Sequence, residues 1–431
     1  MNKLTSKTSQ EAVKRSTFET SRVRSSLLII AVAAALAGCG SQQNTYGKST
    51  NAQANGAAPD FSTFDLRAVI AVPGRPLTAY DISWVDHPTQ TYYLADRSNA
   101  GIDIVSAETN TFIGRVTGFV GADPRGNDFS GPNGVLEVHS AHELWAGDGP
   151  GTIQNSSVKV IDLLADPPQV VDTIFTGGTR RSDEMAYDPA NHTLAVVNNA
   201  DDPPFLTLIS TQERRVLHRL TFDAALGAPF GVTAFTDGLE QPAWDPETHR
   251  FYLSVPELDG VAEHGAIAVI NPLTARVTHL FRVNNCHPAG LTLGPNQHLL
   301  IGCSDPSRSV VMSAEDGSIV AEITQVGGSD EVWFNSSDNH YYLAARNNPG
   351  GAKLGVIDAE TNQFTTSVTT AFNAHSVAVN ENDSHVFVPL GPPRAGHPTD
   401  PNRCVDVGGP SFTGRGCIGV FFRSDASQNE E

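Results

Sequence analysis

Residues 92–105 read Tyr-Tyr-Leu-Ala-Asp-Arg-Ser-Asn-Ala-Gly-Ile-Asp-Ile-Val, and residues 107–112 continue as Ala-Glu-Thr-Asn-Thr-Phe. Two short apolar runs are separated here by a polar loop, and a turn containing Asn follows the second run. This pattern is typical of neighbouring β-strands joined by tight turns. Residues 341–345 (Tyr-Tyr-Leu-Ala-Ala) and 355–364 (Gly-Val-Ile-Asp-Ala-Glu-Thr-Asn-Gln-Phe) repeat it, so the segment is one copy of an internal repeat.

The repeat occurs seven times along the chain. Each copy opens on a polar position, continues through a short apolar strand, a turn and a second apolar strand, and ends with a polar loop, a third strand and an outer strand. The polar positions are Asp81, Asn133, Glu184, Gln241, His287, Glu331 and His375. Their mean spacing of 49 residues is close to the roughly 40 to 50 residues of a four-stranded propeller blade. We therefore predict an all-β fold, a seven-bladed β-propeller over residues 61–423.

The two ends of the repeat region complement each other. The last copy ends after its third strand, at residues 416–422, and only a polar tail at 424–431 remains. Residues 65–72 form a spare apolar strand ahead of the first copy. We expect this N-terminal strand to dock as the missing outer strand of the last blade, which closes the ring and leaves no open sheet edge.

Composition excludes several classes of protein. The chain has 28 Lys and Arg residues against 47 Asp and Glu residues, a net charge of −19, with 39% hydrophobic residues. This balance argues against a nucleic-acid-binding protein, a coiled coil and a disordered chain. The 38 Gly and 27 Pro residues favour many short elements joined by turns. The acidic excess predicts a solvated surface that keeps the protein soluble.

The first 38 residues have the pattern of a signal peptide, because six basic residues precede an apolar run at 27–37. The 11 residues of that run are too few to span a bilayer, which takes about 20. The run ends in Leu36-Ala37-Gly38-Cys39, which resembles the lipobox of bacterial lipoproteins. The resemblance implies lipidation of Cys39 and, with Gly40 next, anchoring at the periplasmic face of the outer membrane. Residues 39–60 would be a flexible tether; the alternative is a Cys39 buried in an N-terminal helix.

The four other cysteines predict two disulfides. Cys286 and Cys303 flank two strands joined by a turn, and Cys404 and Cys417 bracket a Gly-rich loop before the last strand. Disulfides agree with an oxidising compartment such as the periplasm. The alternative, a Cys/His metal site, lacks a Cys-x-x-Cys spacing.

The stretches quoted from residues 92–112 and 341–364 resemble the YVTN-type bacterial propeller repeat. Residues 131–135, Gly-Pro-Asn-Gly-Val, resemble the opening of an NHL-type repeat. The resemblance covers residues 65–422, although the copies between Leu163 and Ala289 match less well. It implies the propeller fold, but such propellers include binding scaffolds, surface proteins, lactonases and lyases.

In a propeller the starts of the inner strands converge at one end of the central channel. Asp81, Asn133, Glu184 and Glu331 are therefore candidate metal ligands, and His287 and His375 are candidate catalytic bases. Oxygen ligands suit Ca²⁺, and the histidines would admit Zn²⁺. This set is similar to that of calcium-dependent gluconolactonase-type propellers, whose metal is held by Glu, Asn and Asp. The alternative is that these polar residues bind channel waters and cap strand ends.

Three further residues follow second strands and should rise on the same face of the ring: Arg97, Asn199 and Arg346. They are candidate ligand-binding residues, or else solvated loop residues. Our leading hypothesis is a lipid-anchored propeller that binds a periplasmic partner protein or a small ligand. The alternative is a metal-dependent hydrolase or lactonase that acts at the channel mouth.

Overall fold

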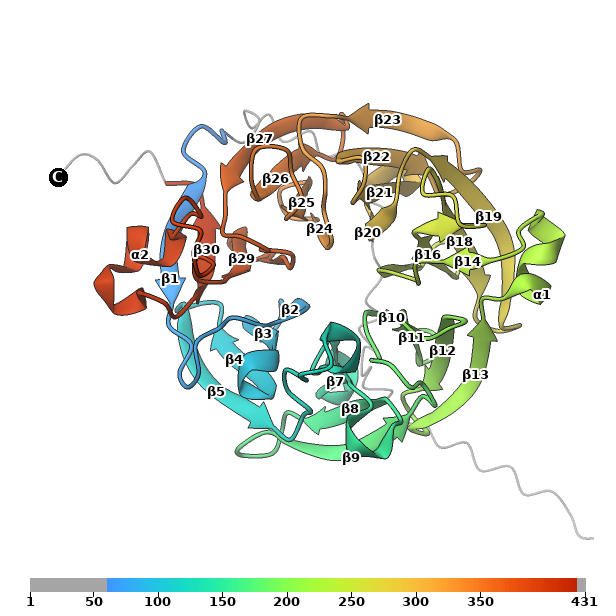
Figure 1. The fold of residues 1–431 in the computed structure, drawn as a ribbon, viewed down its shortest axis with the longest axis horizontal. Helices are drawn as coiled ribbons and strands as arrows, with labels where there is room; N and C mark the ends of the chain where they lie inside the picture. The colour runs from blue at the N-terminus through green and yellow to red at the C-terminus, as the bar shows by residue number, and fades with distance from the viewer. Residues whose placement is uncertain (1–59, 425–431) are drawn as a thin grey trace, which may run out of the picture. The chain divides into compact units, whose positions relative to one another are not determined.

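A computed structural model describes residues 60–424, and these residues form a ring of seven four-stranded antiparallel sheets (Figure 1). The predicted all-β fold and its seven blades are thus confirmed. The signal peptide, Cys39 and most of the tether lie outside the described residues. Blade 1 consists of β2 (Ser83–Asp86), β3 (Thr91–Asp96), β4 (Gly101–Ser106) and β5 (Thr111–Thr117). Blade 2 consists of β6 (Val135–Val138), β7 (Glu143–Asp148), β8 (Ser157–Asp162) and β9 (Gln169–Phe175). Blade 3 consists of β10 (Met185–Asp188), β11 (Thr193–Asn198), β12 (Phe205–Ser210) and β13 (Arg215–Thr221).

Blades 4 to 7 continue the ring in chain order. Blade 4 has β15 (Pro242–Asp245), β16 (Arg250–Val255), β18 (His264–Asn271) and β19 (Arg276–Asn284), and blade 5 has β20 (Pro288–Leu293), β21 (His298–Cys303), β22 (Arg308–Ser313) and β23 (Ile319–Ile323). Blade 6 has β24 (Val332–Asn335), β25 (His340–Ala345), β26 (Lys353–Asp358) and β27 (Gln363–Thr369). Blade 7 has β28 (Ala378–Asn380), β29 (His385–Leu390), β30 (Cys417–Phe422) and β1 (Asp65–Ile70). The first strand of each blade is innermost, so the seven polar positions stand just ahead of the seven inner strands.

The seventh blade combines both ends of the described chain. β1 pairs antiparallel with β30, so that Asp65 lies opposite Phe422 and Ile70 opposite Ile418. Arg403 also donates a hydrogen bond of 2.7 Å to Asp65. Figure 1 shows the blue β1 beside the red β30. Since β1 supplies the outer strand of this sheet, every blade has four strands.

Seven apolar clusters, one at each interface between neighbouring blades, form the core. The cluster between blades 1 and 2 joins Tyr93 and Ile102 to Leu144, and the one between blades 7 and 1 joins Phe387 to Tyr92. The strands place these side chains on both faces of each sheet because alternate residues point to opposite faces. Burial between blades, rather than in one central core, therefore holds the ring together.

The inner strands also contact one another inside the ring. Trp84 of β2 and Trp333 of β24 meet edge to face with ring centroids 5.0 Å apart, although blade 7 separates their blades. The side chain of Gln241 accepts hydrogen bonds from the backbone N–H groups of Leu291 (2.7 Å) and Val332 (3.2 Å). The tryptophan pair thus joins blades 1 and 6, and the hydrogen bonds of Gln241 join blades 4, 5 and 6.

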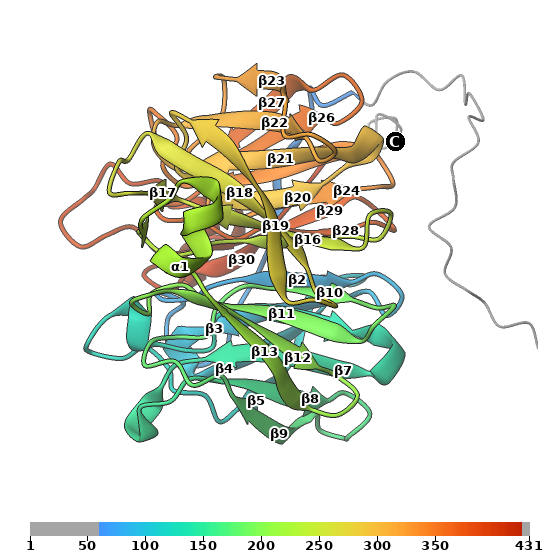
Figure 2. The same cartoon turned by 90° about the vertical axis from the view of Figure 1, so that its right-hand side faces the viewer.

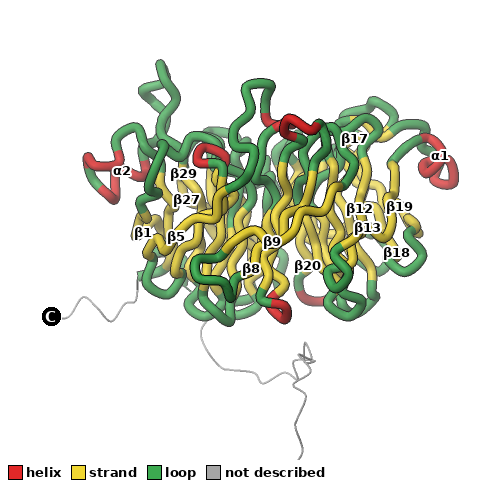
Figure 3. Tube along the Cα trace, turned by 90° about the horizontal axis from the view of Figure 1, so that it is seen from below, coloured by secondary structure: helices red, strands yellow, loops and turns green. Residues whose placement is uncertain are grey.

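Helices are few and short in the described residues. α1 (Ala224–Gly227) and α2 (Arg403–Gly408) lie at the outside of the ring in Figure 1. A minor sheet pairs β14 (Phe235–Thr236) with β17 (Glu257–Leu258). Within residues 60–424 no helix has the length and apolar character needed to cross a bilayer. The sheets stack side by side around the ring in Figure 2, and Figure 3 shows loops gathered at both ends of the strands.

Both predicted disulfides are present. Cys286 is bonded to Cys303, and Cys404 is bonded to Cys417. The first bond joins the start of β20 to the end of β21 within blade 5. The second bond ties α2 to the first residue of β30, so the long loop between β29 and β30 is fixed to the blade that closes the ring.

Candidate functional site

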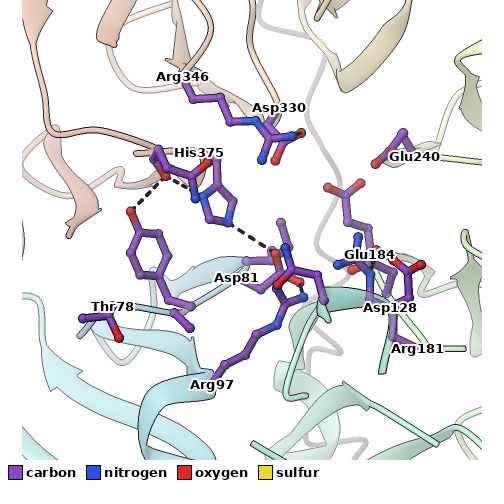
Figure 4. Close-up of a pocket in the computed structure, with 16 residues that line it drawn as sticks. Thr78, Asp81, Arg97, Asp128, Arg181, Glu184, Glu240, Asp330, Arg346 and His375 are labelled. Atoms are coloured by element: carbon purple, nitrogen blue, oxygen red, sulfur yellow. Dashed lines mark hydrogen bonds and ion pairs between the residues drawn. The ribbon is translucent and has the colours of Figure 1, made fainter. Parts of the chain in front are cut away.

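A cavity of about 250 Å³ lies at the channel mouth, where the segments before the inner strands converge (Figure 4). Its wall is strongly polar and mixes both signs of charge. The charged residues that line it are Asp81, Arg97, Asp128, Arg181, Asp183, Glu184, Glu240, Asp330, Arg346 and His375. Six of the seven blades, all but blade 5, contribute these side chains, so the site exists only in the closed ring.

Backbone hydrogen bonds hold the polar positions at the mouth. Asp81 donates its N–H to the carbonyl of Ala95 (2.9 Å), and Asp183 donates to Val197 (2.7 Å). The residues ahead of each inner strand therefore remain paired with the second strand of their own blade. This pairing explains why their side chains come from regular positions around the mouth.

Arg97 is the centre of a buried polar network. Its guanidinium forms an ion pair with Asp81 and donates two hydrogen bonds to the side-chain oxygen of Asn133, at 3.0 and 2.7 Å. Burial opposes ionisation of Asp81, but the charge of Arg97 and the hydrogen bond with His375 prevail and hold the pKa of Asp81 well below its usual range. Arg97 thus occupies the space between two of the four predicted metal ligands.

His375 completes this network from blade 7. Its Nε2 lies 3.4 Å from Asp81, and its Nδ1 donates a hydrogen bond of 2.7 Å to the carbonyl of Asn373. Figure 4 shows Asp81 between His375 and Arg97. Nδ1 is committed as a donor, so Nε2, which faces Asp81, is the nitrogen left to accept a proton.

Two more arginines stand on other sides of the cavity. Arg181 pairs with Asp183 at 2.7 Å and also contacts the side-chain oxygen of Asn199 at 3.3 Å. Burial raises the pKa of Asp183 to about 6, an effect that Arg181 offsets only in part. Arg346 pairs with Asp330 at 2.9 Å and keeps 32% of its side chain exposed. Both guanidinium groups retain N–H donors that these ion pairs and hydrogen bonds do not use.

Three glutamates stand around the mouth: Glu184 and Glu331 are buried, and Glu240 is half-buried. Burial, together with repulsion from neighbouring carboxylates, raises the pKa of Glu184 and Glu240 well above their usual range. Burial does the same to the pKa of Glu331, although Glu331 accepts a hydrogen bond of 3.0 Å from the N–H of Val377. One carboxylate oxygen of Glu184 is buried without a hydrogen-bond partner. The site therefore contains acceptors whose hydrogen-bonding capacity is unfilled.

The structure brings together Asp81, Glu184, His375, Arg97 and Arg346 as lining residues of one cavity. The other candidates lie behind or beside the wall. Asn133 is held by Arg97, Asn199 contacts Arg181, and Glu331 faces the backbone of Val377. His287 lies apart from the lining, where it contacts Asp237 (2.8 Å) and Ser304 (2.9 Å).

Metal-ligand geometry occurs elsewhere in the described residues. Ligand atoms of Asp86, Glu137 and His139 lie within 4.8 Å of one another. Among residues 60–424 this is the one group of three or more His, Cys, Asp and Glu residues with that spacing, and it lies beyond the other end of β2. The predicted ligands at the channel mouth do not form such a group.

Sequence reasoning missed several residues of the cavity wall, namely Tyr80, Asp183, Asp330 and Arg181. A signal for them was present, since three of the four immediately precede a polar position. In the structure both members of the pairs Tyr80-Asp81 and Asp183-Glu184 line the cavity. Arg181 lies two residues before Asp183, in a loop whose path only the folded blade defines.

Comparisons with known proteins identify the fold but no relative of known activity. No protein-family model matches the sequence, and no curated protein does. Among solved structures, the chain is similar to hydrazine synthase from Kuenenia stuttgartiensis, with a TM-score of 0.56 and 11% identity. The match covers 74% of this chain and 95% of that chain. At this identity the likeness supports the propeller fold alone.

Proposed function

We propose that this protein is a lipid-anchored propeller of the YVTN/NHL group in the bacterial cell envelope, and that its channel mouth binds a small polar ligand. One observation carries the proposal: a polar cavity of about 250 Å³ whose wall includes a buried carboxylate oxygen of Glu184 without a hydrogen-bond partner. A buried polar atom without a partner costs about 1 to 3 kcal/mol. A ligand that satisfies such atoms regains part of that cost on binding.

The wall suits a ligand that carries both an anionic group and a hydrogen-bond donor. Arg181 and Arg346 offer guanidinium donors, which bind carboxylates and phosphates well. Glu184 offers an unpartnered buried carboxylate oxygen to a hydroxyl or ammonium group, and Glu240 lines the cavity beside it. Amino acids and small sugar acids combine these groups within the size of the cavity. Ligand pockets commonly measure about 300 to 1,000 Å³, so this one favours a ligand at the small end of that range.

The hydrolase alternative has less support from the geometry. Arg97 stands between Asp81 and Asn133, and Nε2 of His375 faces the carboxylate of Asp81. A metal at these positions would have to displace the guanidinium from a buried ion pair. Binding through the existing donors and acceptors requires no such rearrangement.

A thermal-shift screen of amino acids, amino sugars and sugar acids against the full chain tests the proposal, with isothermal titration of any compound that stabilises it. Arg346→Gln should weaken binding at least tenfold, because it removes a charged donor from the cavity wall. Arg276→Gln, an exposed position on β19, is the matched control and should bind as the wild type does. The proposal fails if no compound in these classes binds, or if binding is insensitive to Arg346→Gln.

A further inference from the structure

We infer that Asp86, Glu137 and His139 form a binding site for a divalent transition-metal ion at the end of the channel opposite the polar cavity. Asp86 is the last residue of β2, whereas Asp81 precedes the same strand. Glu137 belongs to β6, and His139 opens the short turn His139–Ala141 that follows it. The group thus joins blades 1 and 2, and it is independent of the function proposed for the cavity.

The three side chains converge on one point. Nδ1 of His139 lies 3.2 Å from a carboxylate oxygen of Asp86 and 3.6 Å from one of Glu137. Ligands bound to one zinc ion at about 2.0 to 2.2 Å stand roughly 3 to 4 Å from each other. The spacing therefore fits a shared ion with small adjustments of the side chains.

The carboxylate of Asp86 is held in place before any ion binds. The second oxygen of Asp86 accepts hydrogen bonds from the N–H (3.0 Å) and the hydroxyl (2.5 Å) of Thr89. These bonds leave the other oxygen of Asp86 directed at His139. Because the Asp86 carboxylate is fixed, an ion that binds to it loses less conformational freedom than at a flexible surface cluster.

The charges of the group are not balanced. The side chains of Asp86 and Glu137 are 5% and 2% exposed, and among the described residues His139 is the one positively chargeable group within 4.0 Å of either carboxylate. One oxygen of Glu137, a side chain directed at His139, is buried without a hydrogen-bond partner. Two buried carboxylates beside one imidazole are costly unless a cation or proton neutralises them. A divalent ion supplies that charge.

The types of ligand atom in this group favour some metal ions over others. One imidazole nitrogen and two carboxylates suit Zn²⁺, Mn²⁺ and Co²⁺, whereas Ca²⁺ requires six to eight oxygen ligands. The side chain of His139 is 45% exposed, so solvent reaches the site and water can complete the coordination. The imidazole of His142 lies next to that of His139, with ring centroids 5.8 Å apart.

Metal titration of the full chain tests this inference. The protein is stripped with a chelator, dialysed and titrated with Zn²⁺, Mn²⁺ and Co²⁺ by calorimetry, and the visible absorption of bound Co²⁺ reports its coordination. We expect one equivalent to bind with a dissociation constant below about 10 µM. Glu137→Gln and His139→Ala should each weaken binding at least tenfold, because each removes a ligand.

His264→Ala removes an exposed histidine on β18, far along the chain from this group, and is the matched control that should bind as the wild type does. His139→Ala changes a half-exposed side chain, so it keeps the test informative if Glu137→Gln fails to fold. The inference is overturned if none of the three ions binds at a stoichiometry of one at 100 µM. It is also overturned if the bound ion is insensitive to both ligand variants.

Discussion

The aromatic rings of Tyr80 and His375 lie parallel, with centroids 4.9 Å apart, although the two residues belong to the first and last blades. Both side chains donate to the same acceptor, the carbonyl of Asn373, at 3.0 Å from the Tyr80 hydroxyl and 2.7 Å from Nδ1 of His375. This contact holds the seam between blades 7 and 1 at the channel mouth. It also fixes the His375 ring beside Asp81.

Removing the hydroxyl of Tyr80 should weaken this seam modestly. Tyr80→Phe keeps the stacked ring but loses one buried hydrogen bond, so we expect the free energy of unfolding to fall by about 1 kcal/mol. Urea unfolding with a common m-value measures the change. Tyr187→Phe is a suitable control, because the hydroxyl of Tyr187 bonds His192 in a partly exposed hairpin and should matter less. Equal stability of wild type and Tyr80→Phe would contradict the role assigned to this bond.

Substitution of Arg97 should lower the free energy of unfolding far more than Tyr80→Phe does. The side chains of Arg97 and Asp81 are 4% and 8% exposed, so Arg97→Met leaves a carboxylate buried with His375 as its remaining ionic partner. Loss of one member of a buried ion pair costs about 3 to 5 kcal/mol. Asp81→Asn combined with Arg97→Met should recover much of this loss, because no charge is then left uncompensated. A double-mutant cycle by urea unfolding checks this, and additive effects of the two changes would refute it.

Mild acid should stabilise the protein. Burial and neighbouring carboxylates raise the pKa of Glu184 well above its unfolded value, so the folded state holds its proton more tightly. The contribution of Glu184 to the free energy of unfolding is therefore fully present below the pKa that Glu184 has in the unfolded chain. It declines as the pH rises above that value towards the pKa in the folded state. Asp81, whose pKa is depressed, stays ionised throughout pH 5 to 8 and leaves this trend unchanged. The melting temperature should rise as the pH falls from 8 to 5.

Glu184→Gln isolates the contribution of this one group. The variant should exceed the wild type in unfolding free energy by about 1 to 3 kcal/mol at pH 8 and match it near pH 4.5. Thermal unfolding at a series of pH values gives both curves. Glu360→Gln, at an exposed turn, serves as the control and should follow the wild type. A pH-independent effect of Glu184→Gln would count against a raised pKa.

Lipidation of Cys39 remains to be tested in cells. Cys39→Ser removes the thiol that would be acylated, so the protein should move from the membrane fraction to the soluble periplasm or accumulate with its leader attached. Fractionation and the intact mass of the purified protein measure this. Cys404→Ser, which breaks a disulfide, controls for a general effect of losing a cysteine. Membrane association without an acyl mass on Cys39 would exclude the proposed anchor.

Much of the fold was predictable because it depends on local patterns that recur. The quoted apolar runs at 92–95 and 341–345 lie within β3 and β25, the second strands of blades 1 and 6. The inner strands begin one to three residues after their polar positions. Hydrogen bonds such as that from Asp81 to Ala95 nevertheless extend the pairing back to those positions.

The candidate site was harder to predict because it depends on contacts between blades. The spacing of the repeat placed Asp81 and Asn133 at one mouth, but it contained no sign that Arg97 would reach between them. His287 occupies an equivalent position in its repeat and yet turns to Asp237, which belongs to an insertion before blade 4. The group around His139 escaped notice because its members come from two different blades, where β2 and β6 end and the turn after β6 begins.

The pairing of β1 with β30 imposes an order on the biogenesis of this protein. The chain is synthesised from its N-terminus, so β1 emerges first and its partner, which ends at Phe422, emerges last. Until then β1 has a free edge, and a chain interrupted anywhere before residue 417 cannot close. Completion of the ring thus reports that the whole chain has been made, and a truncated product presents an open strand that proteases can attack.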